Sequence, residues 1–414
     1  SELQRRAQQG NADLQRTATR IAESRAELGI AAAQVLPHAS AGAAYSRDGL
    51  SGNGRFAALG APRQPNDFWQ AGFDTSWELD LWGHARRTRE GAFARLEAAV
   101  YEREAARVAL SAEVARAYLQ LRGTQAQLGA AREIVVVAER LLGVAESRER
   151  NGVATHADTL GAQAQLATLR AIVPDLVQRR NALTNALALL LGEAPRALDA
   201  ILGESLPLPA VPAALPVGLP SDLTRRRPDI QRAEALLHAA TAAIGVAQAD
   251  FYPRVDLRGR AGVEAFTSGD LDTWDSRVFS VGPTIYLPLF QGGRLKQRLA
   301  LHEARQKAAA IAYRHTVLQA WHEVDNALDA LAMQQSRYAD LRAAHARNRD
   351  AQHVAVRAYD EGATDLTGML LAQRNLVASQ ADLAAGATDV ALAFVALYKA
   401  LGGGWDVAAA GDGR

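Results

Sequence analysis

Residues 69–81 read WQAGFDTSWELDL, and the polarity of this stretch alternates one residue at a time. The odd positions carry apolar side chains such as Trp69, Phe73 and Trp77, whereas the even positions carry polar ones such as Asp74. Successive side chains of a strand point to opposite faces, so the stretch predicts a strand with one apolar and one polar face. It is long enough for a tilted membrane strand, which needs about 9–11 residues.

The strand around Trp69 is expected to span about 67–82. Three further segments also alternate, at about 253–264 and 277–290 and, more weakly, at about 37–47. One such strand alone also suits a soluble sheet that packs one face on a core. Four of them, in two hairpins with polar loops at 47–66 and 265–277, favour a membrane barrel. The expected lipid-facing side chains are Trp69, Phe73, Trp77, Val255, Leu257, Phe279, Val281 and Ile285.

Long heptad patterns fill most of the remaining sequence. Val114, Leu121 and Leu128 recur every seven residues, with small alanines at the complementary positions, which is typical of coiled-coil packing. Pro174 is expected to kink or break its helix. The predicted long helices cover about 83–150, 154–192, 293–360 and 364–401.

The chain is internally duplicated. Residues 29–37 resemble 245–253, and residues 152–166 resemble 362–376, in the same order along each half. We therefore expect four parts: a first structural repeat at 1–202, a proline-rich crossover at 203–220, a second repeat at 221–402, and a C-terminal tail at 403–414.

Composition excludes several classes of function. Apolar residues make up 49% of the chain but aromatic residues only 6%, as in extended helices rich in alanine and leucine. The net charge of +1 gives no electrostatic reason for nucleic-acid binding. The chain has no cysteine, which excludes disulfides and thiolate metal sites.

No targeting segment or membrane helix is expected in this polypeptide. It has no run of 18 or more apolar residues, from which we expect no helix to cross a bilayer. It also opens without a basic-then-apolar leader, so a signal peptide is expected to be absent.

No pattern of catalytic or metal-binding residues stands out. The nine histidines show no metal-ligand spacing, and His315 and His322 lie seven residues apart on one helix face. No Ser/His/Asp grouping is visible. Neither a metal nor another cofactor is therefore expected, and the chain is expected not to be an enzyme. The run Arg225–Arg227 is interpreted as a solvated helix start before Pro228 rather than as a partner-binding patch.

Four strands per chain cannot close a barrel, because an open sheet edge in lipid leaves backbone groups unpaired. Two copies would give eight strands and an interior filled by side chains, whereas three give twelve strands and room for a lumen. A polar inner face suits a water-filled lumen and therefore favours three copies. The residues themselves therefore favour a mixed α and β membrane protein, in which three chains close a 12-stranded barrel above a ring of long coiled-coil helices.

Four motifs carry a family resemblance: WELDLWG at 77–83, RRPDI at 226–230, LPLF at 287–290 and LYKALGGGW at 397–405. With them the chain resembles the TolC-like outer-membrane efflux factors, in the lipoprotein branch that serves resistance-nodulation-division (RND) multidrug efflux pumps. Matches in the same order span nearly the whole chain.

The resemblance implies the full fold class: a mixed α and β membrane protein with a trimeric 12-stranded outer-membrane β-barrel continuing into a long periplasmic coiled-coil α-barrel, internally duplicated. It also implies an equatorial domain, to which the crossover at 203–220 contributes. The homotrimer would lie in the bacterial outer membrane and extend into the periplasm. The resemblance also implies the function of an exit duct in a tripartite pump, which passively conducts drugs or other small solutes from the periplasm to the exterior. The implied partners are outer-membrane lipid, a periplasmic adaptor (membrane fusion) protein and an inner-membrane RND-type transporter. Together the last two open a gated periplasmic tip.

Two departures from the family pattern bear on these expectations. Members of this branch usually begin with a lipid-modified cysteine and about fifty further residues, and both are absent from this polypeptide. Lipid anchoring is therefore not expected here. At the tip, where the family often has an acidic residue, this chain has Leu371.

Two sets of tip residues follow from the turns and the resemblance. The tight turns at Gly152 and Gly362 must reverse the chain between antiparallel helices. The adaptor-docking residues are expected to be Arg148, Gly152, Val153, Gly362, Ala363 and Thr364. The gate, or constriction, is expected to comprise Asp158, Thr155, Asp365, Thr367, Leu371 and Arg374. Asp158 would form a ring of like charges in a trimer, and Leu371 would form an apolar constriction.

Two alternatives stay open at this point. Thr155 and Asp365 also suit plain helix N-caps. A soluble coiled-coil periplasmic scaffold or adaptor explains the heptads equally well, although it does not explain four strands with apolar alternate faces.

Overall fold

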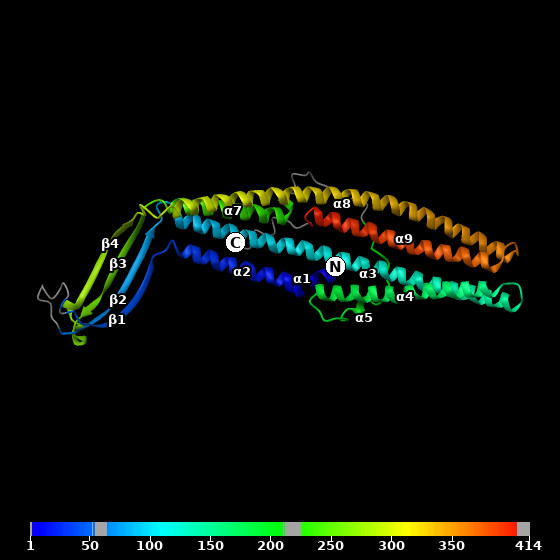
Figure 1. Ribbon diagram of the computed structural model, residues 1–414, viewed down its shortest axis with the longest axis horizontal. Coiled ribbons are helices and arrows are strands. Elements are labelled where there is room, and N and C mark those ends of the chain that lie inside the picture. The colour runs from blue at the N-terminus through cyan, green and yellow to red at the C-terminus, as the bar shows by residue number, and fades with distance from the viewer. Residues whose placement is uncertain (1, 52, 54–63, 210, 212–224, 404–414) are drawn as a thin grey trace. The chain divides into compact units, whose positions relative to one another are not determined.

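The computed structural model describes residues 2–51, 53, 64–209, 211 and 225–403. Most of the expected crossover (203–220), nearly all of the tail (403–414) and the centre of the loop at 47–66 lie outside the described residues. The elements are shown in Figure 1: α1 (Glu2–Gly10), α2 (Ala12–Ala33), β1 (His38–Asp48), β2 (Asn66–Leu79), α3 (His84–Arg150), α4 (His156–Leu190), α5 (Asp199–Leu202), α7 (Pro228–Ala249), β3 (Arg254–Ala265), β4 (Arg277–Tyr286), α8 (Arg294–Asp360) and α9 (Leu366–Ala400), with short 3-10 helices at Ser268–Asp270 and Trp274–Ser276.

The chain divides into two compact units. The strand unit comprises Arg20–Val100 and Arg232–Arg314, and the helical unit comprises Ser1–Thr19, Tyr101–Gln231 and His315–Arg414.

The strand unit is built on one antiparallel sheet in the order β1-β2-β3-β4. The register pairs odd positions with odd positions throughout, so that Phe73 lies between Ala41 and Ala261, and Ala261 pairs with Phe279. The apolar side chains of all four strands therefore share one face, and the polar side chains share the other. Among the described residues, β1 and β4 each pair on one side only.

A row of glycines crosses the polar face. Gly42 pairs with Gly72, which pairs with Gly262. A Cβ on Gly72 would lie 2.7 Å from the Ala261 carbonyl oxygen, and one on Gly262 would lie 2.5 Å from that of Ala71. The backbones of β2 and β3 thus approach too closely for side chains, and such glycine rows allow a sheet to curve sharply.

Two strands end earlier than the sequence predicts. β2 ends at Leu79 rather than near residue 82, because the Asp80 carboxylate accepts hydrogen bonds from the amides of Ala85 (3.0 Å) and Arg86 (2.9 Å) and so caps α3. β4 ends at Tyr286 rather than near 290, before Pro288, which lacks the amide that a ladder needs.

One core cluster of the helical unit joins α1, α2, α3, α4 and α5. Leu121 of α3, Leu187 of α4 and Leu198 before α5 are completely buried in it. Burying one leucine contributes about 1.5–3 kcal/mol. The heptad residues Val114 and Leu121 of α3 therefore pack in one cluster with α1, α2 and α5, as well as with the antiparallel helix α4.

α4 runs unbroken from His156 to Leu190 through Pro174. The expected break is therefore wrong. Both Pro174 and Arg170, whose carbonyl loses its helical partner, are exposed, so water can satisfy the freed backbone group.

α9 corrects a second expectation. By length and composition Thr367–Ala400 is apolar enough to cross a membrane, with a mean hydropathy of 1.4 in its most apolar window. The sequence has no uninterrupted apolar run of this length here, because isolated charges such as Arg374 divide it. Only 33% of that window is buried. Part of its small-residue surface packs on α8, where a Cβ on Gly386 would lie 2.7 Å from a Leu341 methyl carbon.

Candidate gate, docking tip and lipid face

The turn between α3 and α4 is closed by the backbone around Gly152. The Val153 amide donates to the Arg148 carbonyl (2.9 Å), and the Gly152 amide donates to the Glu149 carbonyl (2.9 Å). This pair of bonds is the Schellman arrangement, which requires a left-handed residue, and Gly152 has φ +73°. The turn leaves the Val153 side chain 72% exposed at its apex.

The turn between α8 and α9 repeats this geometry. Ala363 donates to the Ala358 carbonyl (2.7 Å), and Gly362, with φ +74°, donates to that of Tyr359 (3.0 Å). Thr364 also donates to Ala358 (3.2 Å). The two repeats therefore present matching turns, with Val153 in one at the position of Ala363 in the other.

Asp158 holds the start of α4. Its carboxylate accepts hydrogen bonds from the backbone amide and from the hydroxyl of Thr155, both at 2.8 Å. These two bonds lower the pKa of Asp158 below its ordinary value. The capping role expected of Thr155 is thus visible, with Asp158 as its partner, and Asp158 remains exposed and charged near neutral pH.

Asp365 caps α9 and also joins the two hairpins. Its carboxylate accepts from the Gly368 amide (2.9 Å) and forms an ion pair with the Arg148 guanidinium (3.1 Å). The Gly368 bond, followed by the charge of Arg148, lowers the pKa of Asp365. Arg148 was expected to serve docking and Asp365 gating, and the structure places them in contact.

A hollow of about 420 Å³ lies beside this contact. Its wall includes Arg148, Val153, Asp158 and Thr367, with Ala138, Leu141, Val144 and Ala145 of α3. Four residues from the two predicted sets therefore surround one space. Leu371 and Arg374 lie further along α9, Leu371 about half exposed and Arg374 half-buried.

The predicted lipid-facing side chains all occupy the apolar face of the sheet. Phe279, Val281, Phe73 and Ile285 are 68–85% exposed, and Trp77 and Leu257 are also exposed. Trp69 and Val255 are half-buried, since Trp69 packs against Tyr45 with ring centroids 4.4 Å apart. A contiguous apolar face of this kind on an isolated chain indicates a partner surface, either lipid or protein.

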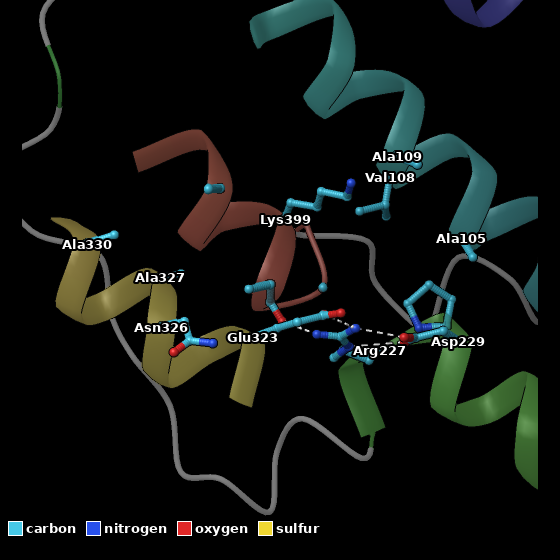
Figure 2. A pocket seen from close by; sticks show the side chains of 14 residues that line it. Ala105, Val108, Ala109, Arg227, Asp229, Glu323, Asn326, Ala327, Ala330 and Lys399 are labelled. Carbon is cyan, nitrogen blue, oxygen red and sulfur yellow. Dashed lines mark hydrogen bonds and ion pairs between the residues drawn. The ribbon is translucent and has the colours of Figure 1, made fainter. Parts of the chain in front are cut away.

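Arg227 forms an ion-pair cluster that sequence reasoning missed. Its side chain is only 8% exposed, and it binds Asp229 (2.7 Å), Glu323 of α8 (2.6 Å) and the Ala400 carbonyl at the end of α9 (2.9 Å). Figure 2 shows the guanidinium between the two carboxylates, beside a hollow of about 530 Å³ that Lys399 also lines. These interactions raise the pKa of Arg227 despite its burial.

Arg227 is thus a structural residue that ties α8 and α9 to the start of α7, and not part of a solvated patch. The pair Arg227 and Asp229, two residues apart, was visible in the sequence. Glu323 lies far along the chain, and nothing in the sequence indicated that it would contact Arg227. Among the residues that the structure describes, no group of three or more histidine, aspartate or glutamate side chains is arranged to hold a metal ion.

Comparisons with known proteins match almost the whole chain. The family model described as "Outer membrane efflux protein" matches residues 3–193 and 219–403. The outer membrane protein OprJ of Pseudomonas aeruginosa is 33% identical over 96% of this chain and 82% of its own. The toluene efflux pump outer membrane protein TtgF of Pseudomonas putida is 33% identical over 98% of this chain and 83% of its own.

Solved structures agree in fold. The outer-membrane channel OprN superposes with a TM-score of 0.89 at 34% identity, covering 98% of this chain and 90% of its own. The outer membrane protein VceC of Vibrio cholerae superposes with a TM-score of 0.88 at 28% identity, covering 98% of this chain and 96% of its own.

These matches confirm the expected fold class, a mixed α and β membrane protein in which three chains supply a 12-stranded outer-membrane β-barrel and a periplasmic α-barrel. The relatives are channel proteins. The chain belongs to the outer membrane efflux protein family and forms an oligomeric exit duct of an efflux pump, located in the outer membrane and extending into the periplasm.

Proposed function

We propose that this duct works in a tripartite pump with a periplasmic adaptor protein and an inner-membrane RND-type transporter, and that it conducts drugs or other small solutes passively. Support comes from relatives whose names refer to toluene efflux and pyoverdine export. A wide water-filled path needs no catalytic group. We therefore propose that the protein is not an enzyme and needs no metal or other cofactor.

We further propose that the apolar face of the sheet contacts lipid and the polar face lines the water path. The observation that carries this proposal is the register, which gathers Phe73, Ala261 and Phe279 on one side and Asp74, Arg260 and Ser280 on the other. A charged side chain on the lipid face near the bilayer midplane costs about 2–4 kcal/mol, whereas lumen substitutions are tolerated.

A matched pair of variants tests this assignment. Phe73→Arg should abolish assembly into the outer membrane, while Asp74→Arg, one residue away, should assemble and change ion permeation in planar bilayers. Equal assembly of both variants would show that the apolar face is covered by protein instead of lipid.

We propose that the tip combines gating and docking in one cluster. The proposed gate comprises Asp158, Thr155, Asp365, Thr367, Leu371 and Arg374, and the proposed docking surface comprises Arg148, Gly152, Val153, Gly362, Ala363 and Thr364. The ion pair between Arg148 and Asp365 supports a mechanical link, because an adaptor that displaces the first hairpin would pull on a gate residue of the second.

The gate proposal is tested by conductance. Asp158→Ala removes one charge per chain from the tip, so conductance of the isolated channel should rise. Asp158→Asn retains the size of the side chain and tests whether the charge matters. Unchanged conductance in both variants would exclude Asp158 from the gate.

We also propose that residues 1–202 and 221–402 are two structural repeats, joined by an equatorial crossover at 203–220 and followed by a tail at 403–414. Each half supplies two strands and two long helices, which supports this division.

A further inference from the structure

The two longest helices both begin with basic side chains. The first two turns of α3 and α8 together carry Arg86, Arg87, Arg89, Arg294, Lys296 and Arg298, and neither helix has an acidic residue in its first turn. A helix N-terminus carries partial positive charge, so cations there are destabilising. The six cations repel one another and the helix dipoles, which indicates that nearby anionic groups offset this repulsion.

Carboxylates of this chain offset only part of this charge. Arg86 pairs with Asp80 (3.2 Å), Arg87 with Glu90 (2.7 Å) and Arg298 with Asp250 (3.0 Å). Arg89 and Lys296 are exposed and form no ion pair with a described residue. A guanidinium has five N–H donors, so the paired arginines also keep donors for a second anion.

Large apolar side chains lie directly between the strands and these basic turns. Leu289 and Phe290 precede α8 and are 88% and 89% exposed, and Leu81 and Trp82 precede α3 and are 57% and 50% exposed. The Trp82 indole donates to the Pro253 carbonyl (2.8 Å), and its ring stacks on Tyr252 at 4.8 Å. Exposed tryptophan and tyrosine at the end of membrane strands are typical of a bilayer interface.

Aromatic and basic side chains meet in one hollow of about 670 Å³. Trp82, Phe251 and Tyr252 line it together with Arg87. The stem of Arg87 packs over Gly245, where a Cβ would lie 2.9 Å from the Arg87 Cγ. This contact holds the stem against α7, and the side chain as a whole stays 53% exposed. Aromatic rings beside a guanidinium match an amphipathic anion.

We propose that this surface binds phospholipids of the leaflet that faces the periplasm. Arg87, Arg89 and Lys296 hold the phosphates of neighbouring lipids, and an acyl chain of the lipid at Arg87 lies against Trp82 and Tyr252 in the hollow. Helical side chains tilt toward the helix N-terminus, which directs these cations back toward the strands. Continuity with the apolar face of the sheet favours lipid over a soluble anion. The inference rests on the proposed lipid contact of that face.

Native mass spectrometry of the detergent-solubilised oligomer tests the proposal. Phosphatidylglycerol and phosphatidylcholine are added separately, and the retained lipids are counted for wild type, for R87Q/R89Q/K296Q and for R179Q/R342Q/R347Q. The last variant removes three exposed cations from the helical unit as a matched control. We expect wild type to prefer phosphatidylglycerol and R87Q/R89Q/K296Q to bind it about tenfold more weakly, with the control unchanged.

Three results would overturn the proposal: equal loss in the control, unchanged binding in R87Q/R89Q/K296Q, or altered ion selectivity of that variant with normal lipid binding. The last result would place these cations on the water path. Conductance of each oligomer in planar bilayers is measured in parallel. A wild-type protein that inserts and conducts but shows no lipid preference refutes this inference alone, whereas failure to insert refutes the proposed duct.

Discussion

Single glycines fix how closely neighbouring strands approach. Gly72 and Gly42 are paired in one row, yet they differ in space: a Cβ on Gly72 meets backbone at 2.7 Å, whereas one on Gly42 has nothing within 4 Å. The row lies on the polar face, so its small size lets that face become concave.

We therefore expect Gly72→Val to prevent or strongly reduce assembly, because β2 and β3 would have to separate. Gly42→Val meets no atom of its own chain within 4 Å, so it should reduce assembly less than Gly72→Val does. Gel mobility of the unboiled oligomer after extraction from membranes measures the difference. Normal assembly of Gly72→Val would mean that the strands adjust without cost.

Arg227 is the second residue whose surroundings dictate its role. Arg227→Met removes the partner of Glu323 and leaves the Ala400 carbonyl without its donor, which should destabilise the protein by about 2–3 kcal/mol. The expected result is a lower thermal transition by several degrees in a fluorescence melt. Arg225→Met, at an exposed position two residues earlier, is the control and should melt like wild type.

At the scale of elements, the starts of α4 and α9 respond to acid. Asp158 and Asp365 both have lowered pKa values in the folded state, through bonds to Thr155 and Gly368 respectively. Their stabilisation is complete above the unfolded value of about 3.9 and is lost as the pH falls through the lower folded values.

We accordingly expect amide exchange in the first turns of α4 and α9 to accelerate, beyond the intrinsic pH effect, as the pH falls below about 4. Asp158→Asn should reduce the pH dependence at α4, where Glu149 also bonds His156, and should leave α9 unchanged as an internal reference. Exchange that follows only the intrinsic rate would show that these carboxylates do not hold the helix starts.

The elements themselves were largely predictable, because their signals are local. The alternation at 69–81 and the heptads through Val114 and Leu121 specified strand and helix without any distant contact. Strand ends were less predictable, since Asp80 ends β2 by capping a helix that begins four residues later. The contact between Arg148 and Asp365 and the partners of Arg227 were not predictable, because they join residues far apart in the chain.

For the whole molecule, the number of chains is the decisive quantity. We expect the mass of the detergent-solubilised particle, after subtraction of bound detergent, to equal three chains of 44.2 kDa. Light scattering with separate protein and detergent signals measures it. A particle of one or two chains would be incompatible with a barrel that has a lumen.

In the described part of the chain, the edge strands β1 and β4 each lack a partner on one side, and this determines how a mutant chain affects wild-type chains in the same ring. Because β1 and β4 are different strands, closure joins the β4 edge of each chain to the β1 edge of the next, in a head-to-tail ring. A single chain with a damaged edge then prevents closure of the ring, even when the other two chains are intact. If such a mutant were co-expressed with wild type in equal amounts and mixed at random, only about one ring in eight would be free of it. Loss of efflux would be inherited as a dominant trait.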